Sequence, residues 1–490
     1  MYSLGVDLGT TKLKVLLLDI ESFKILRVIE GYYRTYRPKP QWAEQDPNDW
    51  WRVLTECLKK IPREDLEKVV SVGVVSQREG IVFIDKSGRL LGRCVIWMDR
   101  RCTKEALEIE EEYGLKEIYY RTRLRPDATF SFPKLLWFRK YSPEVLDKAE
   151  VYLQPKDYLV YRLTGEYTTD YTLASRTMML DIGKLKWIDD FFSKYDIPNK
   201  FPRLYWSNEP IGEVTENTAH ELGLPKGIPV AAGAGDRPAE NFGAGAVKEG
   251  IVVESTGTTT SINSVLSKPL LDPECRIIVS VHMTPGRWLL DTGLSSTGSL
   301  LEWIIDNMFR DFSRDKFFER IDLEVSKIPP GSEGVKVLPF FMGARAPWWK
   351  PVARGGLMGL LLGHSRWHIV RALMEAIAYE VKLVLDIVES LGVKVNEVRC
   401  IGGGARSKEW LKIKSAVYGK KVCVPEAEHA AALTAAVLGA MAAGLVSSLE
   451  EYLSRVQLKS LISPSADLAE EYRRFYLEYR ETAKRFLEFF

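Results

Sequence analysis

Two short segments of the chain place strand-like residues on both sides of a Gly-Thr-Thr tip. Residues 4–17 alternate apolar and polar positions around a tip at 9–11, and residues 251–265 run from a short apolar strand through a tip at 257–259 to a returning strand. A period of two is typical of a strand with one buried face, and the second segment has similar lettering, so each segment predicts a β-hairpin. Because the same device occurs twice, the sequence predicts two related halves, the second beginning near residue 246.

The remaining pattern mixes strands and helices, which predicts an α/β fold. Strand-like apolar runs occur at residues 69–75 and 81–85. Apolar residues recur at spacings of three and four, as on one face of a helix, in residues 48–61, 143–149, 367–391 and 409–418. Residues 430–445 are mostly small and predict a tightly buried helix, whereas the charged residues 465–490 predict a surface helix.

Length and composition favour a fully folded protein of two large domains. A single hydrophobic core stops growing near roughly 250–300 residues. The 490 residues therefore divide most simply into domains 1–245 and 246–490. Hydrophobic residues make up 46% of the chain and charged residues 27%, which excludes the low-hydrophobicity composition of disordered proteins.

Charge, hydropathy and cysteine spacing indicate which partners and which cellular compartment to expect. The 68 basic and 66 acidic residues leave a formal net charge of +2, so no overall field attracts a polyanion and we expect no nucleic-acid partner. No stretch reaches the roughly 18 apolar residues of a membrane span, so we expect no membrane partner. The six cysteines form no metal-binding spacing and no basic leader opens the chain, which predicts reduced thiols in a cytoplasmic protein. A homodimer is one option that the sequence leaves open.

The Gly-Thr-Thr tips have the composition of phosphate-binding turns. Glycine lets the backbone approach a phosphate closely, threonine hydroxyls add donors, and consecutive backbone N–H groups form a concave anion site. Asp7 precedes the first tip, and a carboxylate there can hold Mg²⁺, which prefers carboxylate and phosphate oxygens and keeps several waters. Alternatively, the first tip is a hairpin turn without a ligand. The presence of a second, similar tip favours phosphate binding.

Asp236 is the strongest candidate for a catalytic acid–base group. It directly follows the apolar, glycine-interrupted strand 230–235 and opens a predicted helix. A role as helix N-cap is the alternative, and it is compatible with catalysis. Three other charged residues are interpreted without chemistry: Lys134 as a surface charge, Asp157 as a turn residue and Arg176 as an ion-pair partner.

Taken together, the motifs resemble the FGGY family of carbohydrate kinases along nearly the whole chain. Each motif is weak alone, but they occur in the order and at the spacing of the family. They are residues 5–11 (GVDLGTT), 42–47 (WAEQDP), 156–166 (KDYLVYRLTGE), 233–236 (GAGD), 343–349 (GARAPWW), 356–360 (GLMGL) and 402–407 (GGGARS).

The resemblance implies two actin-like (ribonuclease H-like) ATPase domains with the active site in the cleft between them, and ATP and Mg²⁺ as cofactors. It implies that Asp236 is the general base and that Asp7 is the magnesium-associated carboxylate. The expected nucleotide contacts are Gly9, Thr10, Thr11 and Lys14 around the transferred phosphate, Gly257 and Thr258 in the second tip, and Gly403, Gly404, Ala405 and Ser407 on the adenosine side.

The resemblance places selection of a small sugar or polyol at Gln77, Arg78 and Glu79. Glycerol kinases typically have Gln-Arg-Glu-Thr there, whereas xylulokinases have Met-His in place of Arg78-Glu79. Thr129 stands where glycerol kinases place a tyrosine, and residues 340–343 look more like the xylulose and gluconate branches. A pentulose such as xylulose is the predicted substrate, with glycerol, an autoinducer-2-type sugar and a sugar acid as alternatives.

The chain departs from the family pattern around the expected sugar. Arg237, Lys350 and His429 stand where glutamine, aspartate and glutamate are common. Arg78 and Arg237 in one pocket would suit a carboxylate, whereas the alternative is that Arg237 turns outward to an acid such as Glu240. A different class, an actin-like ATPase without sugar transfer, shares the hairpins but has no need for the polar residues Arg78, Glu79 and Asp236.

Overall fold

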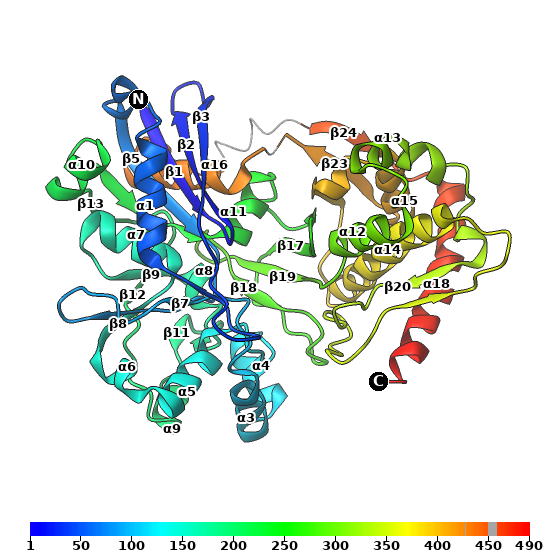
Figure 1. The fold of residues 1–490 in the computed structure, drawn as a ribbon, viewed down its shortest axis with the longest axis horizontal. Coiled ribbons are helices and arrows are strands. Elements are labelled where there is room, and N and C mark those ends of the chain that lie inside the picture. Colours follow the sequence, from blue (N-terminus) through cyan, green and yellow to red (C-terminus); the bar gives the residue numbers. More distant parts are fainter. Residues whose placement is uncertain (427, 449–457) are drawn as a thin grey trace.

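The chain folds into two lobes, each built on a mixed β-sheet, in a computed structural model that describes residues 1–426, 428–448 and 458–490 (Figure 1). The first sheet has the order β13-β14-β5-β1-β2-β3, and β15 also pairs with β5. Its strands are β1 (Tyr2–Leu8), β2 (Lys12–Asp19), β3 (Ile25–Tyr32), β5 (Val69–Ser76), β13 (Pro210–Glu213), β14 (Pro229–Ala231) and β15 (Ala234–Gly235).

The second sheet has the order β18-β19-β17-β16-β22-β23-β24. Its strands are β16 (Ile251–Thr256), β17 (Thr260–Leu266), β18 (Val279–Val281), β19 (Trp288–Leu294), β22 (Glu397–Gly402), β23 (Lys421–Pro425) and β24 (Leu458–Ile462). Both predicted hairpins are present, as β1–β2 and β16–β17.

The two sheets repeat one pattern of strand directions. In the first, β1 pairs antiparallel with β2 and parallel with β5, and β5 pairs parallel with β14. In the second, β16 pairs antiparallel with β17 and parallel with β22, and β22 pairs parallel with β23. Each sheet continues with an antiparallel strand at both ends of this series. The repeated pattern matches the duplication predicted from the two hairpins.

Helices cover the sheets, and shorter strands form small two-stranded sheets at their margins. In the first half of the chain the helices are α1 (Pro47–Leu58), α2 (Arg63–Leu66), α3 (Thr103–Tyr113), α4 (Leu115–Thr122), α5 (Ser131–Tyr141), α6 (Pro143–Lys148), α7 (Pro155–Thr164), α8 (Tyr171–Ala174), α9 (Asp189–Lys194), α10 (Glu216–Leu222) and α11 (Asp236–Gly243). In the second half they are α12 (Gly298–Met308), α13 (Arg314–Val325), α14 (Arg366–Ser390), α15 (Lys408–Tyr418), α16 (Ala430–Ala442) and α18 (Ala466–Leu487), with 3₁₀ turns η1 (Ser332–Gly334) and η2 (Gly403–Ala405). The short strands are β4 (Glu44–Gln45), β6 (Val82–Asp85), β7 (Cys94–Val95), β8 (Ala149–Leu153), β9 (Thr168–Asp170), β10 (Leu180–Asp181), β11 (Lys186–Trp187), β12 (Arg203–Tyr205), β20 (Lys336–Leu338) and β21 (Gly356–Met358).

Capping side chains, proline and glycine mark the ends of several helices. The sequence therefore locates the longer helices well. The Asp46 side chain accepts the N–H of Asn48 and caps α1, and Pro47 is its first residue. The Ser407 side chain caps α15, which ends at Gly419 in the left-handed conformation. The predicted helices 48–61, 143–149, 367–391 and 409–418 are confirmed to within a few residues at each end.

Helix α16 packs on the first sheet although it lies late in the chain. Its backbone comes so close to the sheet that a Cβ on Gly5 would lie 2.1 Å from the carbonyl oxygen of Ala432, and a Cβ on Gly73 would lie 1.9 Å from that of Ala435. Its buried residues join the core cluster that contains Leu16, Leu18 and Val75 of the first sheet. The strands of the first sheet precede residue 245 and those of the second follow it, whereas α16 lies late in the chain and packs on the first sheet. The division into domains 1–245 and 246–490 stays a prediction.

None of the helices in the described part of the chain combines the length and apolar character that spanning a bilayer requires.

Candidate active site

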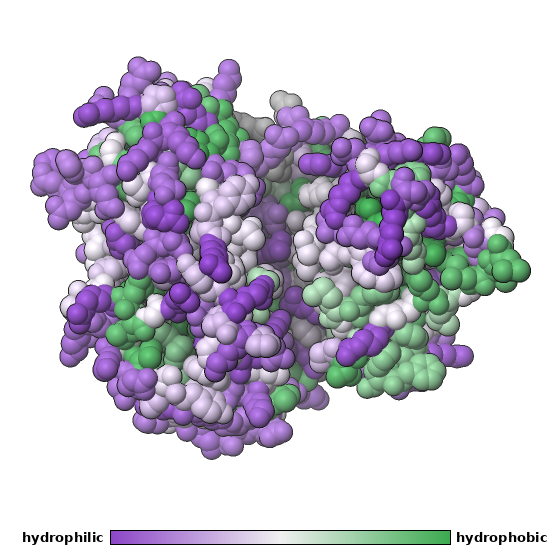
Figure 2. Space-filling view, in the orientation of Figure 1, coloured by the Kyte–Doolittle hydropathy of each residue, from purple (hydrophilic) through white to green (hydrophobic). Residues whose placement is uncertain are grey.

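A furrow separates the two lobes, and hydrophilic side chains line part of it (Figure 2). A cavity of about 720 Å³ lies beside the second hairpin tip and is lined by residues of the second half of the chain, and a cavity of about 580 Å³ has walls from both halves. Asp236, at the start of α11, pairs with Arg78 beyond the end of β5.

Asp236 combines a raised pKa with access to solvent. Its N-cap is Gly235, so Asp236 is the first residue of α11 and not the cap that the alternative interpretation expected. One third of its side chain is exposed, and Arg78 Nε lies 3.4 Å from its Oδ1. Desolvation raises the pKa of Asp236, although Arg78 and Arg237 oppose the shift. A carboxylate with a raised pKa at a helix N-terminus is a suitable acceptor for a hydroxyl proton.

Asp291 on β19 connects the second sheet to this site, and no motif in the sequence identified it. Its carboxylate accepts from Arg78 Nη1 at 2.5 Å and lies 3.4 Å from Arg176 Nη1. Burial alone would raise the pKa of Asp291, but the two arginines hold it below its usual range. Burial alone would lower the pKa of Arg78, yet Asp291, Glu79 and Asp236 raise it. Arg176 is confirmed as an ion-pair partner, and its partners Asp291 and Glu79 lie at the site.

Glu79 is held in an uncommon backbone conformation by a buried lysine. Its φ is 64°, in the left-handed region that non-glycine residues rarely adopt. Lys134 Nζ donates to the Glu79 carbonyl at 2.7 Å, and Arg176 Nε donates to the Glu79 carboxylate at 2.6 Å. The interpretation of Lys134 as a surface charge is wrong, because its side chain is fully buried. Strain of this kind is concentrated at functional sites.

Gln77 is buried and connects the expected sugar site to the first hairpin tip. Its amide donates to Gln45 Oε1 at 2.7 Å, and Gln45 donates to the Thr10 carbonyl at 2.6 Å. The carbonyl oxygen of the Gln77 side chain has no hydrogen-bond partner among the described residues. An unpaired buried acceptor is costly unless a ligand satisfies it.

Aromatic side chains fix the first hairpin tip. Trp97 Nε1 donates to the Thr10 hydroxyl at 2.9 Å, and the Tyr33 hydroxyl donates to the Gly9 carbonyl. Thr11 at the tip is exposed. Neither aromatic residue was identified from the sequence.

Asp7 and Lys14 lie opposite each other on the first hairpin. Lys14 Nζ is 3.7 Å from Asp7 Oδ2. Burial raises the pKa of Asp7 to about 6, Lys14 opposes this, and Asp236 and Glu240 add to it. Among the described residues no group of three or more His, Cys, Asp or Glu could hold a metal ion by itself. This arrangement fits a cation bound by one carboxylate with phosphate and water as its other ligands.

The cavity of about 720 Å³ brings the second hairpin tip together with the glycine-rich turn that follows β22. Gly257 and Thr258 line it, and the N-terminus of α12 holds their carbonyls through the N–H groups of Gly298 and Ser299, at 3.0 and 3.1 Å. Gly403, Gly404 and Ser407 line it next to Thr256, and Asp322 accepts from the Ser407 hydroxyl. Ala405 ends the η2 turn but does not line the cavity. Its apolar walls are Leu301, Phe318, Ile321 and Trp410, which sequence reasoning missed.

Arg237 is engaged by an acid of its own helix. Its Nη1 donates to Glu240 at 2.9 Å and to the Ser261 hydroxyl of β17 at 3.1 Å. The alternative interpretation, an ion pair with Glu240, is therefore confirmed. Arg237 bridges the two halves of the chain and does not present a free guanidinium for a carboxylate.

A buried lysine supports the loop that carries Asp236. Lys156 Nζ donates to the Ala232 carbonyl at 2.6 Å and to Asp157 Oδ1 at 2.7 Å. Asp157, interpreted as a turn residue, is instead a buried ion-pair partner in the first turn of α7. The hydroxyl of Thr172 accepts the N–H of Gly235 at 2.8 Å. These contacts fix the backbone immediately before Asp236.

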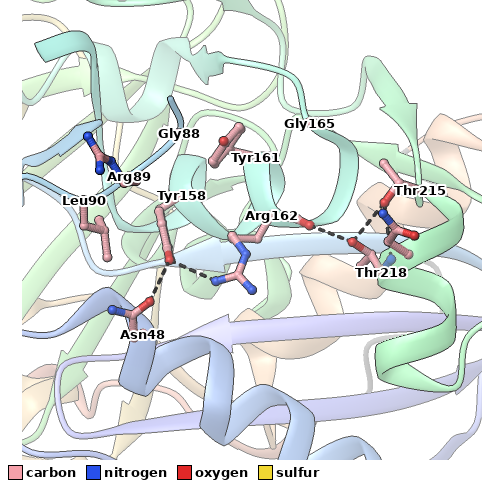
Figure 3. Close-up of a pocket in the computed structure, with 11 residues that line it drawn as sticks. Asn48, Gly88, Arg89, Leu90, Tyr158, Tyr161, Arg162, Gly165, Thr215 and Thr218 are labelled. Carbon is pink, nitrogen blue, oxygen red and sulfur yellow. Dashed lines mark hydrogen bonds between the residues drawn. The ribbon is translucent and has the colours of Figure 1, made fainter. Parts of the chain in front are cut away.

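A further groove of about 600 Å³ lies on the first lobe, beside α7 and the start of α10 (Figure 3). Tyr158 contacts Asn48 and Arg162 there, and the hydroxyl of Thr218 donates to the Arg162 carbonyl. None of the residues assigned to the site lines this groove.

Comparison with known proteins agrees with this geometry. Residues 2–243 match the N-terminal domain of the FGGY family of carbohydrate kinases, and residues 252–443 match its C-terminal domain. The chain is 32% identical to the glycerol kinase of Thermococcus onnurineus (99% of this chain, 97% of the relative), 30% to the xylulose kinase of Escherichia coli (97% and 98%) and 29% to the gluconokinase of Bacillus subtilis (96% and 93%).

Solved structures show the same architecture. A xyloylose kinase from Brucella ovis superposes with a TM-score of 0.92 at 28% identity, covering 99% of both chains. The xylulose kinase of Rhodospirillum rubrum superposes with a TM-score of 0.91 at 26% identity, covering 100% of this chain and 99% of the other. The two sheets are therefore those of two actin-like ATPase domains, and the chain belongs to the FGGY family of carbohydrate kinases, which are phosphotransferases acting on a sugar or polyol.

Proposed function

We propose that the protein transfers the γ-phosphoryl group of ATP to a hydroxyl of a small polyhydroxy substrate, with Asp236 as general base. The observation that carries the proposal is the Asp236 carboxylate, raised in pKa and partly open at the start of α11. Asp236 would take the proton of the acceptor hydroxyl, whose oxygen then bonds to the γ-phosphorus while the bond to the β-phosphate oxygen breaks and ADP leaves.

The nucleotide would occupy the larger cavity, with its phosphates toward the two hairpin tips. Gly257 and Thr258 line that cavity, and Thr10 and Lys14 belong to the first hairpin. Bound Mg²⁺ would neutralise phosphate charge, and Asp7 would hold it. Hydrogen bonds from Trp97 and Gln45 hold Thr10. Thr10 would therefore not need to move while the phosphoryl group is transferred.

The acceptor would lie among Gln77, Arg78 and Glu79. The unpaired carbonyl oxygen of Gln77 would accept from a substrate hydroxyl. A pentulose such as xylulose stays the prediction from sequence, and glycerol, an autoinducer-2-type sugar and a sugar acid stay alternatives. The cytoplasmic location and the possible homodimer also stay predictions.

The decisive experiment measures acceptor-dependent ADP release with xylulose, ribulose, glycerol, erythritol, gluconate and uronate-derived ketoses. Asp236→Asn should reduce this release about 10²–10⁴-fold, because it removes the base but keeps the size of the side chain. Nucleotide affinity, measured by titration calorimetry, should stay within a few-fold. Asp311→Asn, which changes a carboxylate far along the chain in an exposed ion pair with Arg366, is the matched control.

Retention of more than about a tenth of the wild-type turnover by Asp236→Asn would refute the assignment of the base. ADP release that is fast and independent of every acceptor would instead favour the actin-like ATPase class.

A further inference from the structure

The arginines that sequence reasoning offered to an anionic substrate are already neutralised. Arg78 pairs with Asp291 and Asp236, and Arg237 pairs with Glu240. Arg176, which shares Asp291 with Arg78, also pairs with Glu79. An anion recognised in the cleft therefore needs a different guanidinium.

One arginine that lines the cavity of about 580 Å³ meets this need. Its first-half wall consists of α3 and the loop 125–129, and its second-half wall includes Ser295 and the loop 342–351. Arg100, Arg125 and Arg345 line it together with the acids Glu110 and Asp127. The lining thus carries three positive and two negative side chains.

Two of these arginines have partners. Arg100 Nη1 donates to Asp127 at 2.6 Å and to the Thr129 hydroxyl at 3.1 Å. Arg125 Nη1 donates to the Cys275 carbonyl at 3.2 Å, and its guanidinium lies 5.2 Å from the centre of the Trp349 ring. Both side chains are therefore held at the cavity wall.

Arg345 has no such partner. Its guanidinium forms no hydrogen bond or ion pair with any described residue, and its side chain is exposed at the cavity. Desolvation between the two lobes lowers its pKa even though Asp127 favours the charged form. Its donors are therefore not taken up by the protein, and a carboxylate would satisfy this planar group with two parallel hydrogen bonds.

This cavity adjoins the proposed sugar site. Lys134 Nζ donates both to the Thr129 carbonyl at 2.5 Å, in the cavity wall, and to the Glu79 carbonyl at 2.7 Å. Ser295, also in the wall, directly follows the strand that carries Asp291. Arg345 is also close enough to Arg176 and Glu79 to interact with them electrostatically.

We infer that Arg345 binds the carboxylate of a polyhydroxy acid whose hydroxyl is presented to Asp236, so that the acceptor is a sugar acid and not a neutral sugar. The inference rests on the proposed function and narrows its substrate class away from the pentulose predicted from sequence. The Thr129 hydroxyl, which accepts from Arg100, lies in the wall of the same cavity.

The test compares acids with neutral polyols of matched chain length: gluconate with sorbitol, and ribonate with ribitol. The wild-type protein should show a kcat/KM at least tenfold higher for the acid of each pair. Arg345→Met should abolish this preference mainly by raising the KM of the acid at least tenfold, while kcat/KM for the polyol changes less than threefold. Arg345→Lys should restore part of the preference, because it keeps the charge but loses the planar donors.

Arg474→Met, which removes an exposed arginine of α18, is the control and should leave the preference unchanged. A wild-type preference for the polyols, or an equal loss on acid and polyol in Arg345→Met, would overturn the inference. Stronger activity on ribulose 5-phosphate than on either acid would assign the anion to a phosphate and would also overturn it.

A binding measurement tests the inference separately from the proposed catalytic function. If no acceptor is phosphorylated, titration calorimetry with gluconate and sorbitol, in the presence of a non-hydrolysable ATP analogue, still decides the inference. Binding of gluconate that Arg345→Met weakens at least tenfold supports it, and absence of gluconate binding to the wild-type protein contradicts it.

Discussion

At the scale of residues, the site depends on charged groups that neutralise one another across long stretches of sequence. Arg78 and Asp291 are 213 positions apart and form a buried ion pair. Removing one partner of such a pair leaves an uncompensated charge, which is more costly than the pair is stabilising. The ion pairs around Asp236 therefore depend on one another, and loss of one charged group would affect the others.

The threonine hydroxyls of the two tips should serve the transferred phosphate and not the sugar. A hydrogen bond to a charged group contributes about 1.5–3 kcal/mol, so Thr10→Val or Thr258→Val should lower kcat roughly 10–100-fold. The acceptor KM should change by less than about threefold. Steady-state kinetics with saturating ATP measures both quantities.

Thr482→Val is the control, since that hydroxyl bonds only within α18, to the Glu478 carbonyl. A rise confined to the acceptor KM in Thr10→Val would place the first tip at the sugar instead.

At the scale of elements, α16 shows how small residues permit close packing. Its alanines let the helix lie directly on β1 and β5, where Gly5 and Gly73 leave room for its backbone. The alanine-rich pattern predicted a buried helix correctly. It could not indicate which sheet the helix covers, because small residues suit any close helix–sheet contact.

Gly73→Ala should destabilise the first domain by forcing α16 away from β5. The added Cβ would lie 1.9 Å from the Ala435 carbonyl oxygen, and overpacking of this kind costs about 1–3 kcal/mol or more. Thermal unfolding followed by circular dichroism should show a lower Tm.

Gly363→Ala is a matched control, because a Cβ there meets no atom within 4 Å. An equal Tm for the two variants would mean that α16 does not pack on β5 as described.

At the scale of the whole molecule, stability should depend on pH through a carboxyl buried between α14 and α18. Glu380 accepts hydrogen bonds from the Tyr479 hydroxyl at 2.7 Å and from Trp348 Nε1 at 2.9 Å. Burial raises its pKa to about 7, although both hydrogen bonds oppose the shift. In the unfolded chain the pKa is about 4.3.

Because the folded protein retains this proton where the unfolded chain has lost it, the stabilising contribution is complete below about pH 4 and disappears as the pH rises through 7. The wild-type Tm should therefore fall more between pH 5 and pH 8 than the Tm of Glu380→Gln, which does not titrate. Scanning calorimetry at several pH values measures the difference. Parallel Tm curves for the two proteins would contradict the buried, protonated Glu380.

The sequence by itself determined the two hairpins, the α/β class, the glycine-rich turns and the position of Asp236 at the start of a helix. These features depend on periodicity, capping and turn chemistry, which consecutive residues encode. The repeated Gly-Thr-Thr tips were sufficient to predict the duplication of the two sheets.

Only the tertiary structure decided which charges meet. It buried Lys134, which sequence reasoning placed at the surface, and paired Arg237 with Glu240. It also brought Asp291 to Arg78, and it left the Arg345 guanidinium without a hydrogen bond or ion pair to any residue that the structure describes. The physical reason is that the Coulomb energy of a side chain depends on its spatial neighbours and their desolvation, and folding draws those neighbours from distant parts of the chain.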